Sequence, residues 1–366
     1  MIFRTNKYYL LILLTAFFVG GCGNFSGNYE EIESSASSES TTTTTSGAVT
    51  TVAGTGSTGS ANGTGTSASF NYPSGITTDE TNLYVTDGGN LIRKIVISTG
   101  AVTTVAGTGS TGSANGTGTS ASFWSPRGIT TDGTNLYVGD GNNHLIRKIV
   151  ISTGVVTTVA GTGSSGSANG TGTSASFSEP DGITTDGTNL YVADVYNHLI
   201  RQIVISTGVV TTLAGTGSSG SANGTGTSAS FNFPYRITTD GTNLYVADTS
   251  NHLIRQIVIS TGAVTTLAGT GSSGSANGTG TSASFNNPVG ITTDGTNLYV
   301  ADTSNHLIRQ IVISTGVVTT LAGTGSSGSA NGTGTSASFY NPNGITTDGT
   351  NLYVVDTSNH LIRKIE

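Results

Sequence analysis

Five histidines recur once in each of several near-identical copies along the chain, each a few residues after an aspartate. The histidines are His144, His198, His252, His306 and His360, and the aspartates are Asp87, Asp140, Asp194, Asp248, Asp302 and Asp356. Imidazole and carboxylate groups together could bind a metal ion or transfer protons. A catalytic role would require one copy to differ, and these residues do not. We therefore expect the histidines to bond nearby aspartate or backbone groups, and the aspartates to cap their loops through local backbone bonds.

The large differences between copies fall in two short windows. The first window flanks the proline that marks each copy, at Pro73, Pro126, Pro180, Pro234, Pro288 and Pro342. The second is the loop before Asn-His, where Val195-Tyr196 replaces Thr-Ser. Aromatic and arginine side chains are enriched there, as they are on binding surfaces, whereas drift in a surface loop is the alternative explanation. The candidate ligand-binding residues are Tyr72, Trp124, Arg127, Glu179, Asp181, Tyr196, Phe233, Tyr235, Arg236 and Tyr340.

Oxygen-bearing side chains in the first window could also bind Ca²⁺. They are Glu179, Asp181, Asn287, Asn341 and Asn343, of which only two are carboxylates. We therefore predict no metal site and no required cofactor. No Ser-His-Asp arrangement stands out, so no catalytic residue is assigned.

The spacing of the marker prolines indicates a repeated β-sheet unit. The first step is 53 residues and the next four are 54, a period typical of a propeller blade. In the fifth copy we predict strands at 290–293, 298–302, 307–313 and 317–322, joined by short turns such as Asp294-Gly295-Thr296-Asn297. The Gly/Ser/Thr stretches between copies are predicted to be spacers, each ending in a phenylalanine that plugs the core.

The two ends of the repeat region predict a closed ring. Residues 361–366 form a third strand with no fourth after it, and residues 48–53 form a fourth strand with no blade before it. The predicted fold is all-β, a six-bladed β-propeller of four-stranded antiparallel blades in which the N-terminal strand completes the last blade and leaves no open sheet edge. A parallel β-helix is the alternative. In a propeller, both variable windows lie on one face, around the mouth of the central channel.

Three short strings within each copy resemble the NHL repeat. In the fifth copy they are Phe285-x-x-Pro288-x-Gly290-Ile291, Leu298-Tyr299-Val300-Ala301-Asp302 and Asn305-His306-Leu307-Ile308-Arg309. Members of that family form six-bladed β-propellers, so the resemblance implies the same fold. It implies less about function, because relatives bind proteins, RNA or sugars and a few are lyase-type enzymes.

Residues 1–22 are typical of an export signal. Arg4 and Lys7 precede an apolar run over 8–19. The segment Val19-Gly20-Gly21-Cys22 resembles the lipobox of bacterial lipoproteins, which implies that Cys22, the single cysteine, is acylated. We expect residues 23–46 to be a flexible Ser/Thr-rich tether and residues 47–366 to be the propeller. The predicted location is the bacterial cell envelope, lipid-anchored at the outer membrane or the cell surface.

The composition narrows the classes of partner. Lys+Arg number 13 and Asp+Glu number 20, and the net charge is −7. An acidic, charge-poor chain does not suit nucleic acid, because phosphate neutralisation needs clustered basic residues. We expect a monomeric, non-enzymatic protein that recognises a protein or glycan through the channel-mouth face and reaches the membrane through its lipid anchor. The alternatives are a metal-dependent lyase or hydrolase, and a purely structural surface spacer.

Overall fold

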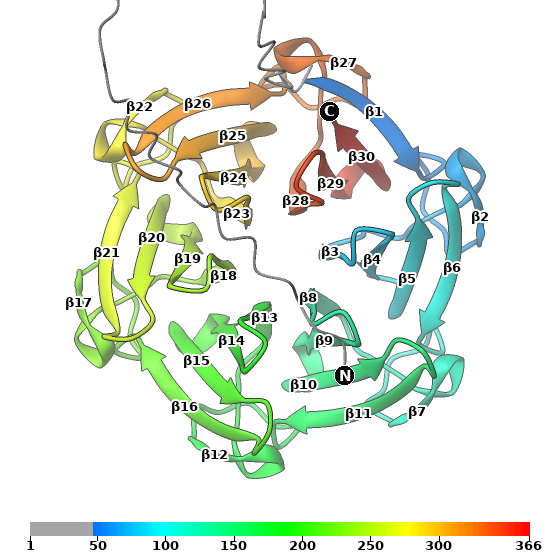
Figure 1. The fold of residues 1–366 in the computed structure, drawn as a ribbon, viewed down its shortest axis with the longest axis horizontal. Helices are drawn as coiled ribbons and strands as arrows, with labels where there is room; N and C mark the ends of the chain where they lie inside the picture. Colours follow the sequence, from blue (N-terminus) through cyan, green and yellow to red (C-terminus); the bar gives the residue numbers. More distant parts are fainter. Residues whose placement is uncertain (1–46) are drawn as a thin grey trace, which may run out of the picture. The chain divides into compact units, whose positions relative to one another are not determined.

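The computed structural model describes residues 47–366, which form a closed ring of six antiparallel sheets (Figure 1). The predicted six-bladed β-propeller is therefore confirmed, and the β-helix alternative is excluded. The predictions for residues 1–46, including the acylated Cys22, lie outside the described residues. Within residues 47–366, no helix is long and apolar enough to cross a membrane.

Each blade follows the same strand order from the channel outward, and we number the blades 1 to 6 along the chain. The innermost strands are β3 (Ile76–Thr78), β8 (Pro126–Thr131), β13 (Pro180–Thr185), β18 (Pro234–Thr239), β23 (Pro288–Thr293) and β28 (Pro342–Thr347). The second strands are β4 (Asn82–Asp87), β9 (Asn135–Asp140), β14 (Asn189–Asp194), β19 (Asn243–Asp248), β24 (Asn297–Asp302) and β29 (Leu352–Asp356). The third strands are β5 (Leu91–Val96), β10 (Leu145–Val150), β15 (Leu199–Val204), β20 (Leu253–Val258), β25 (Leu307–Val312) and β30 (Leu361–Ile365).

The fourth strands are β6 (Ala101–Ala106), β11 (Val155–Ala160), β16 (Val209–Ala214), β21 (Ala263–Ala268), β26 (Val317–Ala322) and, in blade 6, β1 (Ala48–Ala53). A fifth strand of two residues lies outside each fourth strand, so the blades have five strands instead of the predicted four. These outer strands are β2 (Gly63–Thr64), β7 (Gly116–Thr117), β12 (Gly170–Thr171), β17 (Gly224–Thr225), β22 (Gly278–Thr279) and β27 (Gly332–Thr333). The Gly/Ser/Thr stretches are thus part of the blades and not spacers.

Short 3-10 helices complete the blades at two places. One set follows the outer strands: η1 (Gly65–Ser67), η2 (Gly118–Ser120), η4 (Gly172–Ser174), η6 (Gly226–Ser228), η8 (Gly280–Ser282) and η10 (Gly334–Ser336). The other set joins the second and third strands of blades 2 to 6: η3 (Gly141–Asn143), η5 (Val195–Asn197), η7 (Thr249–Asn251), η9 (Thr303–Asn305) and η11 (Thr357–Asn359). The loop of blade 1 is one residue shorter and contains no such helix.

The strand β1 closes the ring as predicted. It pairs antiparallel with β30 on one side and with β27 on the other. In Figure 1 the blue strand β1 lies beside the red C-terminal strand β30. Because β1 fills the fourth position of blade 6, the third strand of that blade is not left as an open edge.

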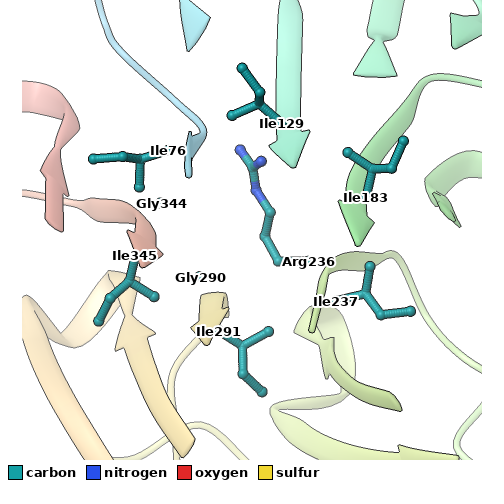
Figure 2. Close-up of a pocket in the computed structure, with 9 residues that line it drawn as sticks. All are labelled: Ile76, Ile129, Ile183, Arg236, Ile237, Gly290, Ile291, Gly344 and Ile345. Carbon is teal, nitrogen blue, oxygen red and sulfur yellow. The ribbon is translucent and has the colours of Figure 1, made fainter. Parts of the chain in front are cut away.

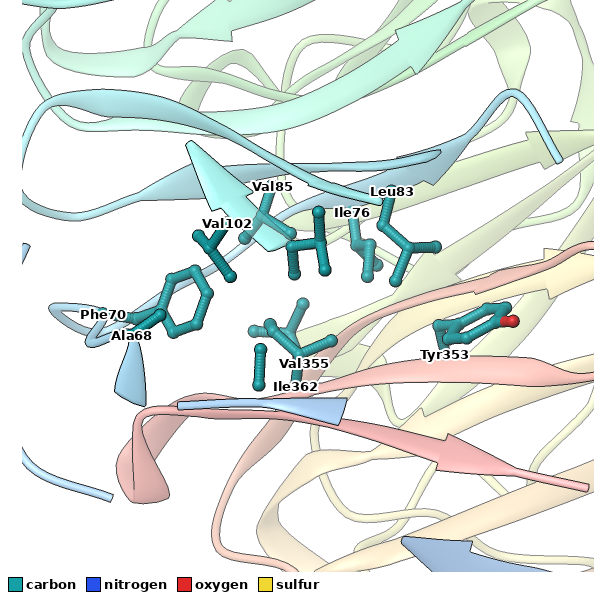
Figure 3. Close-up of a cluster of buried hydrophobic side chains, with 11 residues drawn as sticks. Ala68, Phe70, Ile76, Leu83, Val85, Val102, Tyr353, Val355 and Ile362 are labelled. Carbon is teal, nitrogen blue, oxygen red and sulfur yellow. The ribbon is translucent and has the colours of Figure 1, made fainter. Parts of the chain in front are cut away.

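The hydrophobic core is divided among the junctions between neighbouring blades. Figure 3 shows one such cluster, in which Phe70, Leu83 and Val85 from blade 1 meet Val355 and Ile362 from blade 6. Strands buried on both faces explain why their sequences are nearly continuous apolar runs. The phenylalanine three residues before each marker proline is fully buried, as predicted for a core plug; these residues are Phe70, Phe123, Phe177, Phe231, Phe285 and Phe339.

A fully buried ion pair in each blade was not predicted. In blade 2, Arg147 Nη1 lies 2.8 Å from Asp140 Oδ2, and both side chains are 0% exposed. The guanidinium also donates to the carbonyls of Ser122 and Ala114 and to Asn115 Oδ1. Burial raises the pKa of the matching Asp194 to about 6, although hydrogen bonds and Arg201 oppose this effect. The expected backbone bonds are also present, because Oδ1 of each aspartate accepts a backbone N–H, as Asp140 does from Trp124 and Asp87 from Gly89. Holding an arginine 6 or 7 residues away is a second role of these aspartates that was not predicted.

Candidate binding face

The two variable windows meet on one face of the propeller, as predicted. Pro180, at the start of β13, is paired with Asp194, at the end of β14. The loop that follows Asp194 therefore lies beside the residues that precede Pro180. The backbone N–H of Tyr196 donates to the carbonyl of Ser178 at 3.2 Å, which links the second window directly to the first. We call this side of the ring the channel-mouth face.

The repeated histidines hold neighbouring blades together at this face. His198 Nδ1 accepts a hydrogen bond from the backbone N–H of Phe233 in the next blade at 3.1 Å. The same bond joins His144 to Glu179, His252 to Asn287, His306 to Asn341 and His360 to Tyr72. In blade 1, which lacks the histidine, Asn90 Oδ1 accepts from Ser125 instead. The predicted structural role of the histidines is confirmed, with the bond running between blades.

Eight of the ten predicted site residues lie on blades 2, 3 and 4, and seven of them, all except Trp124, form one group. Arg127 of blade 2 lies 2.7 Å from Glu179 and 3.7 Å from Asp181, both of blade 3. Burial would lower the pKa of Arg127, but the two carboxylates outweigh this effect and raise it. Burial, and then the charge of Asp181, raise the pKa of Tyr235. We define the blade 2–4 cluster as Arg127, Glu179, Asp181, Tyr196, Phe233, Tyr235 and Arg236.

Arg236 crosses the central channel and closes it. Figure 2 shows its side chain extending among the isoleucines of the innermost strands, where the remaining cavity measures about 40 Å³. Its Nε lies 3.1 Å from Asp181 Oδ1, and its Nη2 donates to Ser74 Oγ and Asn343 Oδ1. Burial lowers the pKa of Arg236, with Asp181 opposing the shift. Arg236 and Asp181 are therefore buried supports of the face and are not surface contacts.

Tyr196 and Phe233 form the aromatic part of the blade 2–4 cluster. Their ring centroids are 5.2 Å apart with an interplanar angle of 89°, and Phe233 also makes an edge contact with His198. Tyr196 remains 49% exposed. The inter-blade histidine thus supports Phe233, which in turn supports a tyrosine that faces solvent.

The other three predicted residues do not join this cluster. Tyr72 packs against His360, and Tyr340 packs against His306, at the blade 6/1 and blade 5/6 junctions. Trp124 is 46% exposed at the start of blade 2, where its backbone N–H donates to Asp140. These aromatics are separate exposed points around the same face.

The oxygen-bearing side chains considered as calcium ligands form ion pairs and hydrogen bonds with other protein groups. Asp181 and Asn343 both contact Arg236, whose guanidinium lies where a cation would have to sit. Asn287 and Asn341 donate to Ser304 and Ser358. Among residues 47–366, no group of three or more histidine, cysteine or acidic side chains is arranged to hold a metal ion. The residues present do not fit a calcium site.

Two polar residues of the face were not among the predicted site residues. Ser74 and Asn343 bind the guanidinium of Arg236 from blades 1 and 6, across the channel from blade 4. Both lie directly after a marker proline, in the first variable window. Their position in the first variable window was the sequence feature that could have identified them as site residues. Only the geometry of the ring, however, brings both of them to the same arginine.

The similarity to known proteins agrees with this fold. No family model matches the chain. The chain is 30% identical over 336 residues to NHL repeat-containing protein 2 of Bos taurus, covering 81% of this chain and 46% of that protein. The predicted resemblance to NHL-repeat propellers is confirmed. This NHL-type propeller spans less than half the length of that relative.

Two solved structures from Bacteroides thetaiotaomicron share the fold of this NHL-type propeller. One is a structural genomics protein of unknown function, with a TM-score of 0.67 and 22% identity, covering 87% of this chain and 75% of that one. The other is an auxiliary nutrient binding protein, with a TM-score of 0.65 and 19% identity, covering 87% and 76%. At this level of identity the likeness concerns the fold alone.

Proposed function

We propose that this NHL-type propeller is a non-enzymatic binding protein that holds a protein or glycan ligand on its channel-mouth face. One observation carries the proposal: in a chain of near-identical copies, unlike side chains of three adjacent blades pair across the blade junctions, Arg127 with Glu179 and Asp181, Asp181 with Arg236, and Tyr196 with Phe233. Neutral substitutions scattered over the copies would not be expected to produce oppositely charged partners and packed aromatic rings across neighbouring blades. The fold neighbour described as an auxiliary nutrient binding protein supports a binding role.

The charged residues of the cluster suit binding better than catalysis. A general acid or base must be able to reach substrate. Asp181 and Arg236 are buried, and Arg127 and Glu179 are paired with each other. An enzyme of the lyase or hydrolase type would require a free acid or base at this mouth. A purely structural spacer would show no saturable binding at all.

The test is a glycan and protein array probed with the purified full chain and with three replacements made together, Tyr196→Ala, Phe233→Ala and Tyr235→Ala. We expect the wild-type chain to bind a defined ligand and the triple variant to lose at least tenfold in affinity. Val209→Ala, which truncates a side chain on the exposed rim (38% exposed), is the matched control and should bind as wild type. Ligand binding that survives the triple replacement would contradict the proposal.

The proposal also includes the location inferred from residues 1–22. We propose that acylated Cys22 anchors the protein in the bacterial cell envelope, with residues 23–46 as the tether. Cys22→Ser should move the protein from the membrane fraction to the soluble fraction. An unchanged distribution would overturn the lipid anchor without affecting the binding face.

A further inference from the structure

The charges of the blade 2–4 cluster cancel one another. Arg127 pairs with Glu179 and Asp181, and Asp181 also pairs with Arg236, so two cations face two carboxylates. An anionic ligand attracted to Arg127 would be repelled by the neighbouring Glu179. A cationic ligand attracted to Glu179 would be repelled by the neighbouring Arg127. The cluster therefore favours neither anionic nor cationic ligands, because for either sign the repulsion from two of its charges opposes the attraction to the other two.

The same groups keep the capacity to form hydrogen bonds with a neutral ligand. The side chains of Arg127 and Glu179 are 23% and 26% exposed while paired to each other. Guanidinium nitrogens only donate and carboxylate oxygens only accept. A ligand hydroxyl does both, so a pair of hydroxyls could bond to the two groups without separating them.

The aromatic part of the cluster offers an apolar surface within electrostatic range of these polar groups, since Tyr196 and Tyr235 both interact with the charge of Arg127. Tyr196 is half exposed and is held by its edge contact with Phe233. A protein partner would be expected to anchor a side chain in a pocket. Arg236 occupies the channel itself, and the cavity left among the isoleucines of the innermost strands is about 40 Å³, so the channel offers no room for such an anchor. A flat ligand with an apolar face and hydroxyl edges fits the cluster better.

We infer that the ligand recognised by the blade 2–4 cluster is a neutral saccharide, whose C–H face packs on Tyr196 and whose hydroxyls bond to Arg127 and Glu179. This inference rests on the proposed function and names its ligand class. It identifies Tyr196 and Phe233 as the residues that determine binding, and the Arg127–Glu179 pair as the origin of selectivity against charged sugars.

The copies themselves supply the test variants. Tyr196 corresponds to Ser250 and Ser304 in blades 4 and 5, and Phe233 corresponds to Asn287 and Asn341 in blades 5 and 6. Tyr196→Ser and Phe233→Asn therefore restore side chains that the same backbone already carries elsewhere. Val209→Ala is the matched control, because it restores the alanine found at positions 101 and 263 and lies on the exposed rim outside the cluster.

The experiment titrates the full chain with neutral gluco-, xylo-, manno- and galacto-hexasaccharides, and with hexagalacturonate and hexaglucosamine as the charged counterparts. Calorimetry gives the affinity. We expect saturable binding of at least one neutral oligomer, a loss of at least tenfold in the Tyr196→Ser/Phe233→Asn variant, and a change of less than twofold in Val209→Ala. Glu179→Gln leaves Arg127 less compensated and should raise the affinity for hexagalacturonate about tenfold.

The outcomes separate this inference from the proposed function. Preferential binding of a charged oligomer by the wild-type chain would overturn the neutral class. If no saccharide binds but a defined protein binds and is lost in the double variant, the saccharide inference fails and the binding face remains. If no array ligand of either kind depends on Tyr196 and Phe233, both fail.

Discussion

His198 of blade 3 accepts a hydrogen bond through Nδ1 from the backbone N–H of Phe233 in blade 4, and the two rings meet edge to face at 4.9 Å. One contact thus joins two adjacent blades and supports a residue of the blade 2–4 cluster. Five of the six junctions use a histidine in this way, and Asn90 serves the sixth. This bond requires an unprotonated Nδ1, because a protonated ring nitrogen cannot accept.

The first prediction is that the histidine bonds contribute less stability to the ring as the pH falls below about 6.5, the ordinary histidine pKa. Burial lowers the pKa of His198, His252, His306 and His360, so the folded state binds fewer protons than the unfolded state in this range. The free energy of unfolding is then greatest above the ordinary pKa and decreases until the pH has passed the lowered folded-state pKa. Urea unfolding at pH 7.5 and 5.5 measures the difference.

A control is built into the chain for this prediction. Asn90 occupies the histidine position in blade 1, with the same left-handed backbone (φ 61°) and an acceptor oxygen. Replacing the four histidines by asparagine should remove the acid-dependent loss. Burial raises the pKa of all six aspartates of the buried ion pairs, to about 6 for Asp194, which acts in the opposite direction. These aspartates are common to both proteins, so their effect cancels in the comparison. Equal pH profiles for the two proteins would contradict the assignment.

The second prediction concerns the buried ion pair of each blade. Arg201→Met leaves Asp194 buried without its cation, and we expect a loss of about 3–5 kcal/mol in the free energy of unfolding. Gln202→Lys on the same strand is the control, because blades 1, 2 and 6 carry lysine there, and it should change stability by less than about 0.5 kcal/mol. Chemical denaturation gives the free energy of unfolding of both variants. An equally small loss of that free energy in Arg201→Met and Gln202→Lys would show that the ion pair contributes little to stability.

The third prediction concerns Arg236, which replaces the glycine of the other copies. Arg236→Gly removes the ion pair with Asp181 and the hydrogen bonds to Ser74 and Asn343, at a cost of about 1–3 kcal/mol. The strands themselves should be unaffected, because five copies carry glycine there. Thermal unfolding gives the loss. A crystal structure of the variant should show a central cavity larger than 40 Å³, and an unchanged cavity would be inconsistent with the plug.

The fourth prediction concerns closure by β1. Val49 is 1% exposed between β30 and β27, so Val49→Asp should cost more than about 3 kcal/mol by burying a charge in place of an apolar side chain. The exposed neighbour gives the control, since Thr50→Asp keeps the backbone pairing and should cost far less. Light scattering should detect association of Val49→Asp chains through the edge of β30. Monomeric, stable Val49→Asp protein would mean that β1 is not needed for closure.

The near-exact repetition of the chain by itself determines the architecture. The 54-residue period, the Asp-Gly-Thr-Asn turns and the divided last blade predict six sheets and their closure, because each depends on local hydrogen bonding or on counting strands. The two-residue outer strands were missed because glycine-rich sequence has little intrinsic strand preference. They form only where the preceding stretch reaches the fourth strand of its own blade, as Gly63 reaches Val102.

The candidate site divides in the same way. The sequence alone identified the residues of the blade 2–4 cluster, since copies that are otherwise alike reveal the unlike positions, but it did not identify Ser74 and Asn343 as partners of Arg236. Only the tertiary structure showed that Arg127, Glu179, Asp181 and Arg236 neutralise one another, and that Tyr72 and Tyr340 stand apart from them. The physical reason is distance: positions about 54 residues apart in sequence become neighbours when blades pack, and those two or three blades away usually do not. Arg236 is the exception, because a long side chain at the centre of a ring can reach several blades at once.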